Sequence, residues 1–168
     1  MLNATELAAE GLALAYEGHE GRRVHRVSHG WASDLWNRVV VLADGRNVGL
    51  RKPSCDFVSE GADGALVRFI EVKGKRSSVA SSIPLLDRQM DTSEALGDLY
   101  WLYVGFDVLT PDGYLVVLPS PHLLPWRLLD QEQPRSTTCR VQDERRWFVS
   151  PNEVLRRAAR VWPPTGSL

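Results

Sequence analysis

The apolar segment from Leu99 to Leu109 constrains the fold more than any other part of this chain. A strand at the protein surface alternates polar and apolar side chains, whereas this segment is almost continuously aromatic or aliphatic. We therefore predict a central β-strand that is buried on both faces. Asp112-Gly113 predicts a turn, and the apolar residues 114–118 then form the next strand.

A second run rich in apolar residues, Val67 to Val72, ends in Glu71-Val72-Lys73. Side chains alternate along a strand, so Glu71 and Lys73 share one face and Val72 takes the other. Asp56 stands at the head of a neighbouring apolar run, which gives the spacing Asp-x14-Glu-x-Lys. Two carboxylates hold a hard divalent cation through oxygen, and a lysine can steer a phosphate or orient an attacking water. The pattern predicts a site for a cation and a phosphodiester.

The same residues have a purely structural alternative. Glu71 and Lys73 could form an exposed ion pair on an edge strand, with Asp56 in a turn, and such a pair contributes only about 0–1 kcal/mol. Phe69 and Ile70 argue against an edge position, because they indicate a central strand. Charged side chains such as Glu71 and Lys73 are unusual on a central strand unless they have a function.

The N-terminal segment predicts a helix that starts at Asn3 or Thr5 and runs to Glu17, with Asn3-x-x-Glu6 resembling a capping box and Gly18 as the stop. At about 100° per residue, Glu6, Glu10 and Glu17 fall along one line of this helix. We interpret Glu6 and Glu17 as a solvated acidic edge.

The remaining elements follow from alternation, turn residues and caps. We predict strands over 23–28, 36–42, 47–50, 139–141 and 146–149, a helix over 87–96, and a C-terminal helix that starts at Ser150-Pro151 and extends to Trp162. One face of that last helix carries Arg156, Arg157 and Arg160. Such a face is more often solvated, and phosphate binding is the alternative.

Three stretches of the chain together resemble a known family: Phe69-Ile70-Glu71-Val72-Lys73-Gly74, Ile83-Pro84-Leu85-Leu86, and the run from Gly97 to Val104. The spacing Asp56-x14-Glu71-x-Lys73, which includes the first stretch, resembles the catalytic signature of the PD-(D/E)XK nuclease superfamily. All three together resemble the family named after the C terminus of the plant NO VEIN protein, a domain of unknown function. The resemblance extends from Ala8 to Leu118, about two thirds of the chain.

This resemblance implies an α/β (α+β) fold with a restriction-endonuclease-like core. A central mixed β-sheet would be flanked by helices, in the order α-β-β-β-α-β. Residues 1–125 would form the nuclease-like domain, with an inserted hairpin at about 29–53 that the family usually lacks. Residues 126–168 would form a C-terminal extension, with a hairpin and an amphipathic helix packed on the same domain.

The resemblance also implies a metal-dependent endonuclease, a hydrolase of phosphodiester bonds. The expected Mg²⁺ or Mn²⁺ ligands are Asp56, Glu71 and the carbonyl of Val72. Lys73 would position or deprotonate the attacking water. In the superfamily, an acidic residue of the first helix and a Gln or Glu of the second helix often complete such sites. Glu10 and Gln89 occupy those places, although the NO VEIN-like family tends to have Asn-Glu near Gln89.

A basic, hydroxyl-rich loop follows the predicted site directly, and a nucleic-acid backbone would pass there. A polar surface loop without that role is an equal alternative. The loop comprises Lys75, Arg76, Ser77 and Ser78.

Composition limits the partners and the compartment. The net charge is −1, so nucleic-acid binding needs a local basic patch rather than total charge. The two cysteines, Cys55 and Cys139, have no metal-binding or disulfide spacing and favour a reducing compartment. No apolar run approaches the ~20 residues that cross a bilayer, so we expect a cytoplasmic protein without a membrane partner.

DNA is the expected substrate. By resemblance, members of the family occur with ATPase or helicase regions or in genome defence, so we expect a separate motor subunit or a homodimer. A catalytically silent module that binds nucleic acid or a protein partner is the alternative. Asp56, Glu71 and Lys73 argue against it, because a degenerate domain usually loses at least one such residue.

Overall fold

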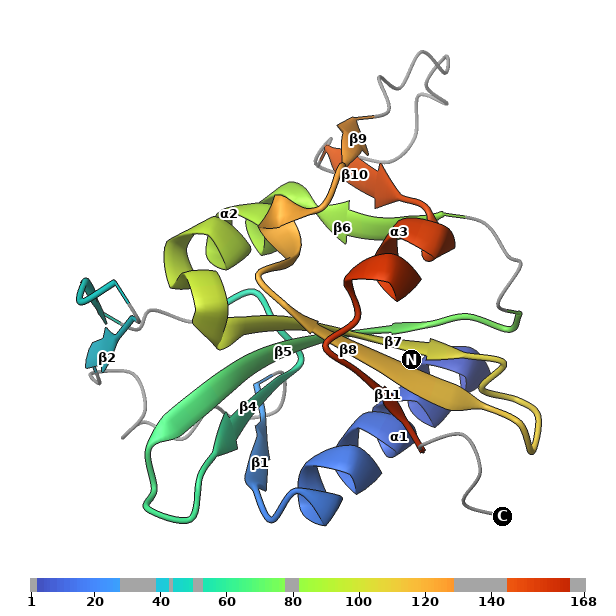
Figure 1. Ribbon diagram of the computed structural model, residues 1–168, viewed down its shortest axis with the longest axis horizontal. Coiled ribbons are helices and arrows are strands. Elements are labelled where there is room, and N and C mark those ends of the chain that lie inside the picture. The colour runs from blue at the N-terminus through green and yellow to red at the C-terminus, as the bar shows by residue number, and fades with distance from the viewer. Residues whose placement is uncertain are drawn as a thin grey trace, which may run out of the picture.

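The computed structural model describes residues 3–27, 39–42, 44–49, 53–77, 82–128 and 145–163, and the other residues lie outside this description. Figure 1 shows the arrangement of its elements. The α-helices are α1 (Ala4–His19), α2 (Asp87–Leu96) and α3 (Pro151–Arg157), with short 3-10 turns η2 (Gly97–Leu99) and η3 (Pro121–Leu123). The strands are β1 (Arg23–Arg26), β2 (Val39–Val41), β3 (Asn47–Gly49), β4 (Phe57–Glu60), β5 (Leu66–Gly74), β6 (Ile83–Leu86), β7 (Tyr100–Phe106), β8 (Tyr114–Pro119), β9 (Arg127–Leu128), β10 (Arg146–Val149) and β11 (Arg160–Trp162).

A six-stranded sheet in the order β1-β4-β5-β7-β8-β11 forms the centre of the molecule. β5 and β7 run parallel, and the other neighbouring strands of this sheet run antiparallel. The parallel pair needs a crossover, and β6 and α2 supply it, because antiparallel pairs alone can be joined by tight hairpins. The prediction of a mixed α/β fold with a central mixed sheet is confirmed.

The central position of β7 follows from its sequence, as predicted. Tyr103 packs in the cluster that includes α1, whereas Leu102 and Val104 pack in the cluster on the opposite face. The strand is shorter than the apolar segment, because Leu99 belongs to η2 and the chain turns at Asp107, whose φ is 52°.

Helical layers cover both faces of the central sheet. α1 covers one face, and α2, α3 and the small sheet β6-β10-β9 cover the other (Figure 1). The predicted hairpin at Asp44-Gly45 is present as β2 and β3, and Gly45 has the positive φ of 82° that this turn requires. In the described part of the chain, no helix is both long and apolar enough to cross a bilayer.

α1 begins as predicted, with Asn3 and Glu6 exchanging side-chain and backbone hydrogen bonds. The interpretation of Glu17 as a solvated residue is wrong, because Glu17 is 1% exposed. Burial by itself raises the pKa of the Glu17 carboxyl, but hydrogen bonds from Arg22, Ser59 and Tyr103 outweigh burial and lower it. These donors belong to three different parts of the fold, and they fix the end of α1 to the sheet.

Two paired glycines let the first half of α1 approach the sheet closely. Gly74 of β5 lies opposite Gly105 of β7. A Cβ at Gly74 would lie 2.5 Å from the carbonyl oxygen of Thr5, and one at Gly105 would lie 3.1 Å from the Cβ of Ala9. This contact holds the start of α1 beside the end of β5, where the candidate site lies.

The predicted C-terminal helix is wrong beyond residue 157. The helix α3 ends at Arg157, Ala158 is extended, and residues Arg160–Trp162 form β11 on the edge of β8. A continued helix would leave the β8 edge unpaired, and Pro163 restricts the residue before it to extended conformations. The C-terminal segment thus supplies β10 to the small sheet and β11 to the central sheet. The strand over 146–149 is confirmed as β10, while the predicted 139–141 partner lies outside the described residues.

Candidate functional site

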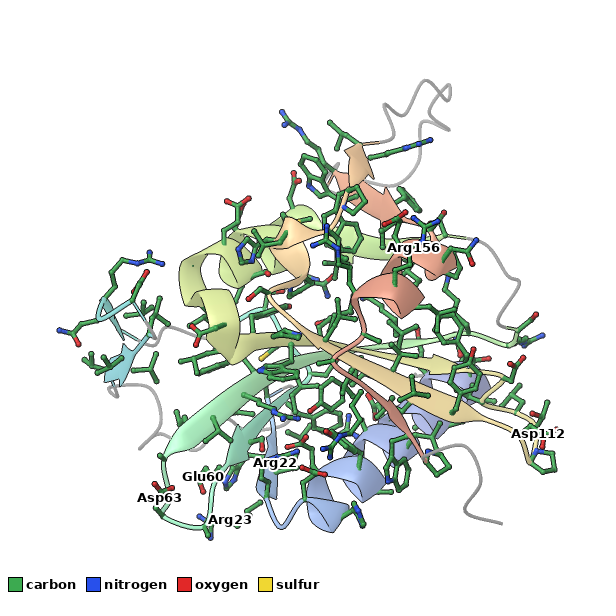
Figure 2. All side chains as sticks on the ribbon, viewed as in Figure 1. Arg22, Arg23, Glu60, Asp63, Asp112 and Arg156 are labelled. Atoms are coloured by element: carbon green, nitrogen blue, oxygen red, sulfur yellow. The ribbon has the colours of Figure 1, made fainter. Side chains whose placement is uncertain are left out.

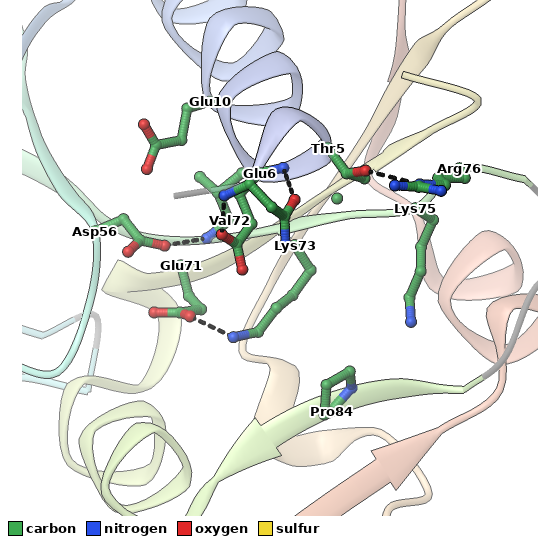
Figure 3. Close-up of a pocket in the computed structure, with 12 residues that line it drawn as sticks. Thr5, Glu6, Glu10, Asp56, Glu71, Val72, Lys73, Lys75, Arg76 and Pro84 are labelled. Atoms are coloured by element: carbon green, nitrogen blue, oxygen red, sulfur yellow. Dashed lines mark hydrogen bonds and ion pairs between the residues drawn. The ribbon is translucent and has the colours of Figure 1, made fainter. Parts of the chain in front are cut away.

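An open cleft of about 640 Å³ lies between the N-terminal half of α1, the end of β5 and the start of the small sheet (Figure 3). Carboxylates line one part of the cleft, and lysine and arginine side chains line another. Seven of the residues that the sequence predicts for the site reach its wall: Glu10, Asp56, Glu71, Val72, Lys73, Lys75 and Arg76. Positions separated by up to 66 residues along the chain therefore meet at one place.

Asp56 occupies the point where the β4–β5 ladder ends. Its backbone N–H donates to the carbonyl of Ile70 at 2.9 Å, and the Val72 N–H donates to its side-chain Oδ2 at 2.8 Å. The carboxylate thus replaces the next backbone acceptor of the ladder. The Tyr100 hydroxyl donates to the carbonyl of Ser54 at 2.7 Å and holds the segment before Asp56.

Glu71, Lys73 and Gln89 form one hydrogen-bonded group. The Lys73 Nζ donates to Glu71 Oε1 at 2.6 Å and to Gln89 Oε1 at 3.4 Å, and the Gln89 Nε2 donates to Glu71 Oε1 at 2.5 Å. The backbone N–H of Leu86, just before α2, donates to Gln89 Oε1 at 3.0 Å. Glu71 and Lys73 share a strand face as predicted, and Gln89 from α2 fixes the orientation of both.

The electrostatics of the two carboxylates follow from burial. Burial raises the pKa of Glu71 to about 7, Lys73 opposes that increase, and the charge of Asp56 adds to it. Burial also raises the pKa of Asp56, which the Val72 N–H and the charge of Lys73 partly offset. Two carboxyls with raised pKa values in an open cleft are typical of a functional site.

These residues fit a divalent cation by the chemistry of their oxygens. Glu71 is 3% exposed, and no described residue donates to its Oε2. In Asp56, Oδ2 accepts from Val72, and no donor from the described part of the chain reaches Oδ1. A cation would compensate a buried carboxylate that the Lys73 ammonium and the Gln89 amide contact at one oxygen only. Across the described segments, no three His, Cys, Asp or Glu side chains converge as a metal-holding group, so Val72 and water would supply the remaining oxygens.

Glu10 reaches the cleft from α1 and is held by a residue that the sequence analysis did not single out. The Arg26 guanidinium donates to both Glu10 oxygens, at 3.1 and 2.5 Å, and lies 4.8 Å from the ring centre of Phe57. Arg26 ends β1 on an alternating segment, and nothing in its local sequence indicates a partner on α1.

The basic part of the cleft is formed by the loop after β5. The Lys75 Nζ donates to the carbonyl of Ser82 at 2.7 Å, and the Arg76 Nε donates to the Thr5 hydroxyl at 3.3 Å. Burial and the nearby charge of Lys73 lower the pKa of Lys75. Ser77 is half-buried and does not line the cleft, and Ser78 lies outside the described residues.

Comparison with known proteins gives one match. The sequence profile of the family described as "Protein NO VEIN, C-terminal" matches residues 32–115, half of the chain. This range contains Asp56, Glu71, Lys73 and Gln89, while Glu10 precedes it. No curated protein matches the chain, and no solved structure matches it. The chain belongs to the family of the protein NO VEIN C-terminal domain.

Proposed function

We propose that this protein is a metal-dependent endonuclease that hydrolyses phosphodiester bonds of nucleic acid, with DNA as the expected substrate. One observation carries the proposal: the carboxylates of Asp56 and Glu71 meet beside the Lys73 ammonium in a cleft with basic residues on another side. An exposed ion pair on an edge strand does not account for a buried Glu71 and a half-buried Asp56 whose carboxyl pKa values are both raised.

In the proposed reaction, different side chains bind the cation, activate the water and contact the phosphates. Asp56, Glu71 and the carbonyl of Val72 would hold Mg²⁺ or Mn²⁺. A cation held there would polarise a scissile phosphate and lower the pKa of a bound water molecule. The Lys73 ammonium orients the attacking water and stabilises negative charge that develops on the phosphate. Gln89 keeps the Lys73 and Glu71 side chains in place, and Lys75 and Arg76 contact the flanking phosphates.

The succession of elements also supports a nuclease core of the PD-(D/E)XK kind. Apart from the β2–β3 hairpin and β6, the chain runs α1, β1, β4, β5, α2, β7. The first three strands are antiparallel neighbours, and the crossover through α2 places β7 parallel to β5. With those elements set aside, this succession supports the α-β-β-β-α-β order that the resemblance implies.

We further propose a cytoplasmic role in genome defence or DNA processing together with an ATPase or helicase-type partner or a second copy of the chain. One such site cuts one strand at a time, so cleavage of both strands of a duplex calls for two copies. The net charge of −1 makes unaided binding of long DNA weak, which favours a partner that engages the DNA.

The test is a cleavage assay with supercoiled plasmid, linear duplex and single-stranded DNA, in Mg²⁺, Mn²⁺ or EDTA. The wild type is compared with Asp56→Asn and with Asp91→Asn, which changes an exposed aspartate of α2. We expect metal-dependent cleavage by the wild type and the control and none by Asp56→Asn. Equal cleavage by all three proteins, or cleavage that persists in EDTA, would refute the proposal.

A catalytically silent binding module is the second candidate. The described residues bring together two carboxylates rather than three, and Lys73 and Gln89 already occupy one oxygen of Glu71. A folded wild type that binds DNA without cutting any substrate, in either metal, would favour this module.

A further inference from the structure

We propose that the outer face of the small sheet β6-β10-β9 is a binding platform for single-stranded nucleic acid that continues from the cleft. This inference rests on the proposed function, because it takes the cleft to be where nucleic acid binds. It names a surface and an occupant that the catalytic residues do not imply.

The register of the small sheet determines which residues share that face. Directly opposite residues of antiparallel strands point to the same side. Phe148 of β10 lies opposite Pro84 of β6 on one side and opposite Arg127 of β9 on the other. Arg146 lies opposite Leu86 in the same set, because side chains two residues apart share a face.

The opposite face of the same sheet packs against the hydrophobic core. Ile83, Leu85 and Val149 are buried in the cluster with β7 and β8, and Trp147 packs against that cluster. Phe148 belongs to none of the described core clusters and remains partly exposed. The partly exposed Phe148 ring therefore lies on the outer face of the small sheet, on the strand between β6 and β9.

Charge and continuity identify the occupant. Arg127 and Arg146 are exposed beside Phe148, and no described carboxylate is within ion-pair distance of either. Pro84 lines the cleft below Lys73 and Lys75 (Figure 3), so the platform begins at the wall of the candidate site. With strands about 4.8 Å apart, the row from Pro84 through Phe148 to Arg127 extends about 10 Å outward.

An aromatic ring flanked by arginines on a sheet is suited to unpaired bases. A base of a single strand can stack on Phe148 while its phosphates meet the arginines. The bases of a duplex are already stacked inside the helix and present only phosphates to such a surface. The platform therefore favours single strands over duplexes.

The test is fluorescence anisotropy with a labelled single-stranded oligonucleotide and a matched hairpin duplex, in EDTA so that nothing is cleaved. Phe148→Ala should weaken single-strand binding about tenfold, with little effect on the duplex, and Phe148→Trp should retain it. Arg127→Ala should reduce the slope of log affinity against log salt by about 0.7. Arg23→Ala is the control, because Arg23 lies at the opposite end of the molecule from β9 and β10 (Figure 2).

The outcomes separate this inference from the proposed function. Single-strand binding that depends on Phe148, in a protein that cleaves nothing, supports the platform and refutes the nuclease. Cleavage with single-strand affinity that is unchanged in Phe148→Ala, or in Arg127→Glu if the former does not fold, overturns the platform alone. Binding of a protein through this face, with no single-strand affinity, also overturns it.

Discussion

Replacing Glu71 with glutamine should stabilise the cation-free protein at alkaline pH. Burial raises the pKa of this carboxyl from its ordinary value of 4.5 to about 7. Between these two values, the folded protein holds a proton that the unfolded chain has released. The stability of the wild type therefore falls as pH rises through this window. Glutamine mimics the protonated acid and does not titrate, so the variant avoids this loss.

The expected size follows from the two pKa values. At ~1.4 kcal/mol per pH unit, the interval from 4.5 to about 7 corresponds to about 3 kcal/mol of stability. The free energy of unfolding of Glu71→Gln minus that of the wild type should thus rise by up to about 3 kcal/mol between pH 4 and pH 8. The Lys73 ion pair is already included in the raised pKa and reduces the effect rather than reversing it.

The assay is urea unfolding in EDTA at pH 4, 5, 6, 7 and 8, with Glu94→Gln as the control because Glu94 is exposed on α2. The control should show no such pH-dependent gain. A difference between Glu71→Gln and the wild type that stays constant with pH would refute the reasoning. A difference that instead falls between pH 4 and pH 8, so that the wild type gains stability relative to the variant, would show that the ion pair with Lys73 outweighs burial.

Three further predictions concern packing, a buried hydrogen bond and metal linkage. Gly74→Ala should destabilise the protein by about 1–3 kcal/mol in urea unfolding, because its Cβ would meet the α1 backbone at 2.5 Å. Gly11→Ala, with open space around its Cβ, should instead be neutral or stabilising by up to about 1 kcal/mol. Tyr103→Phe should cost about 1–3 kcal/mol, since it removes a 2.5 Å hydrogen bond to the buried Glu17. Mn²⁺ should raise the thermal unfolding midpoint of the wild type but not of Asp56→Asn, and equal increases would place the cation elsewhere.

Much of the central sheet could be predicted because its strands are specified locally. The unbroken apolar segment that contains β7 and the alternation at the end of β5 each reflect the burial of one strand. The placement of Glu71 and Lys73 on one face follows from that alternation alone. The approach of Asp56 also followed, because β4 and β5 are joined by a short turn.

The errors arose where structure depends on distant partners. Glu17 is buried because Arg22, Ser59 and Tyr103 supply donors from elsewhere in the fold, and no local pattern indicates them. Residues 160–162 have a helical pattern, but they form the strand β11 because the edge of β8 offers them backbone hydrogen-bond partners. The ion pair between Arg26 and Glu10 likewise joins residues that only the folded arrangement of β1 and α1 brings together.

The most direct test of the central claim compares Lys73→Ala with the wild type in single-turnover cleavage of labelled DNA at saturating Mn²⁺, with Mn²⁺ binding measured on the same samples. If Asp56 and Glu71 hold the cation and Lys73 acts on the water and the phosphate, the variant should bind Mn²⁺ and cleave about 100-fold more slowly or worse. Cleavage at the wild-type rate by Lys73→Ala would contradict this account.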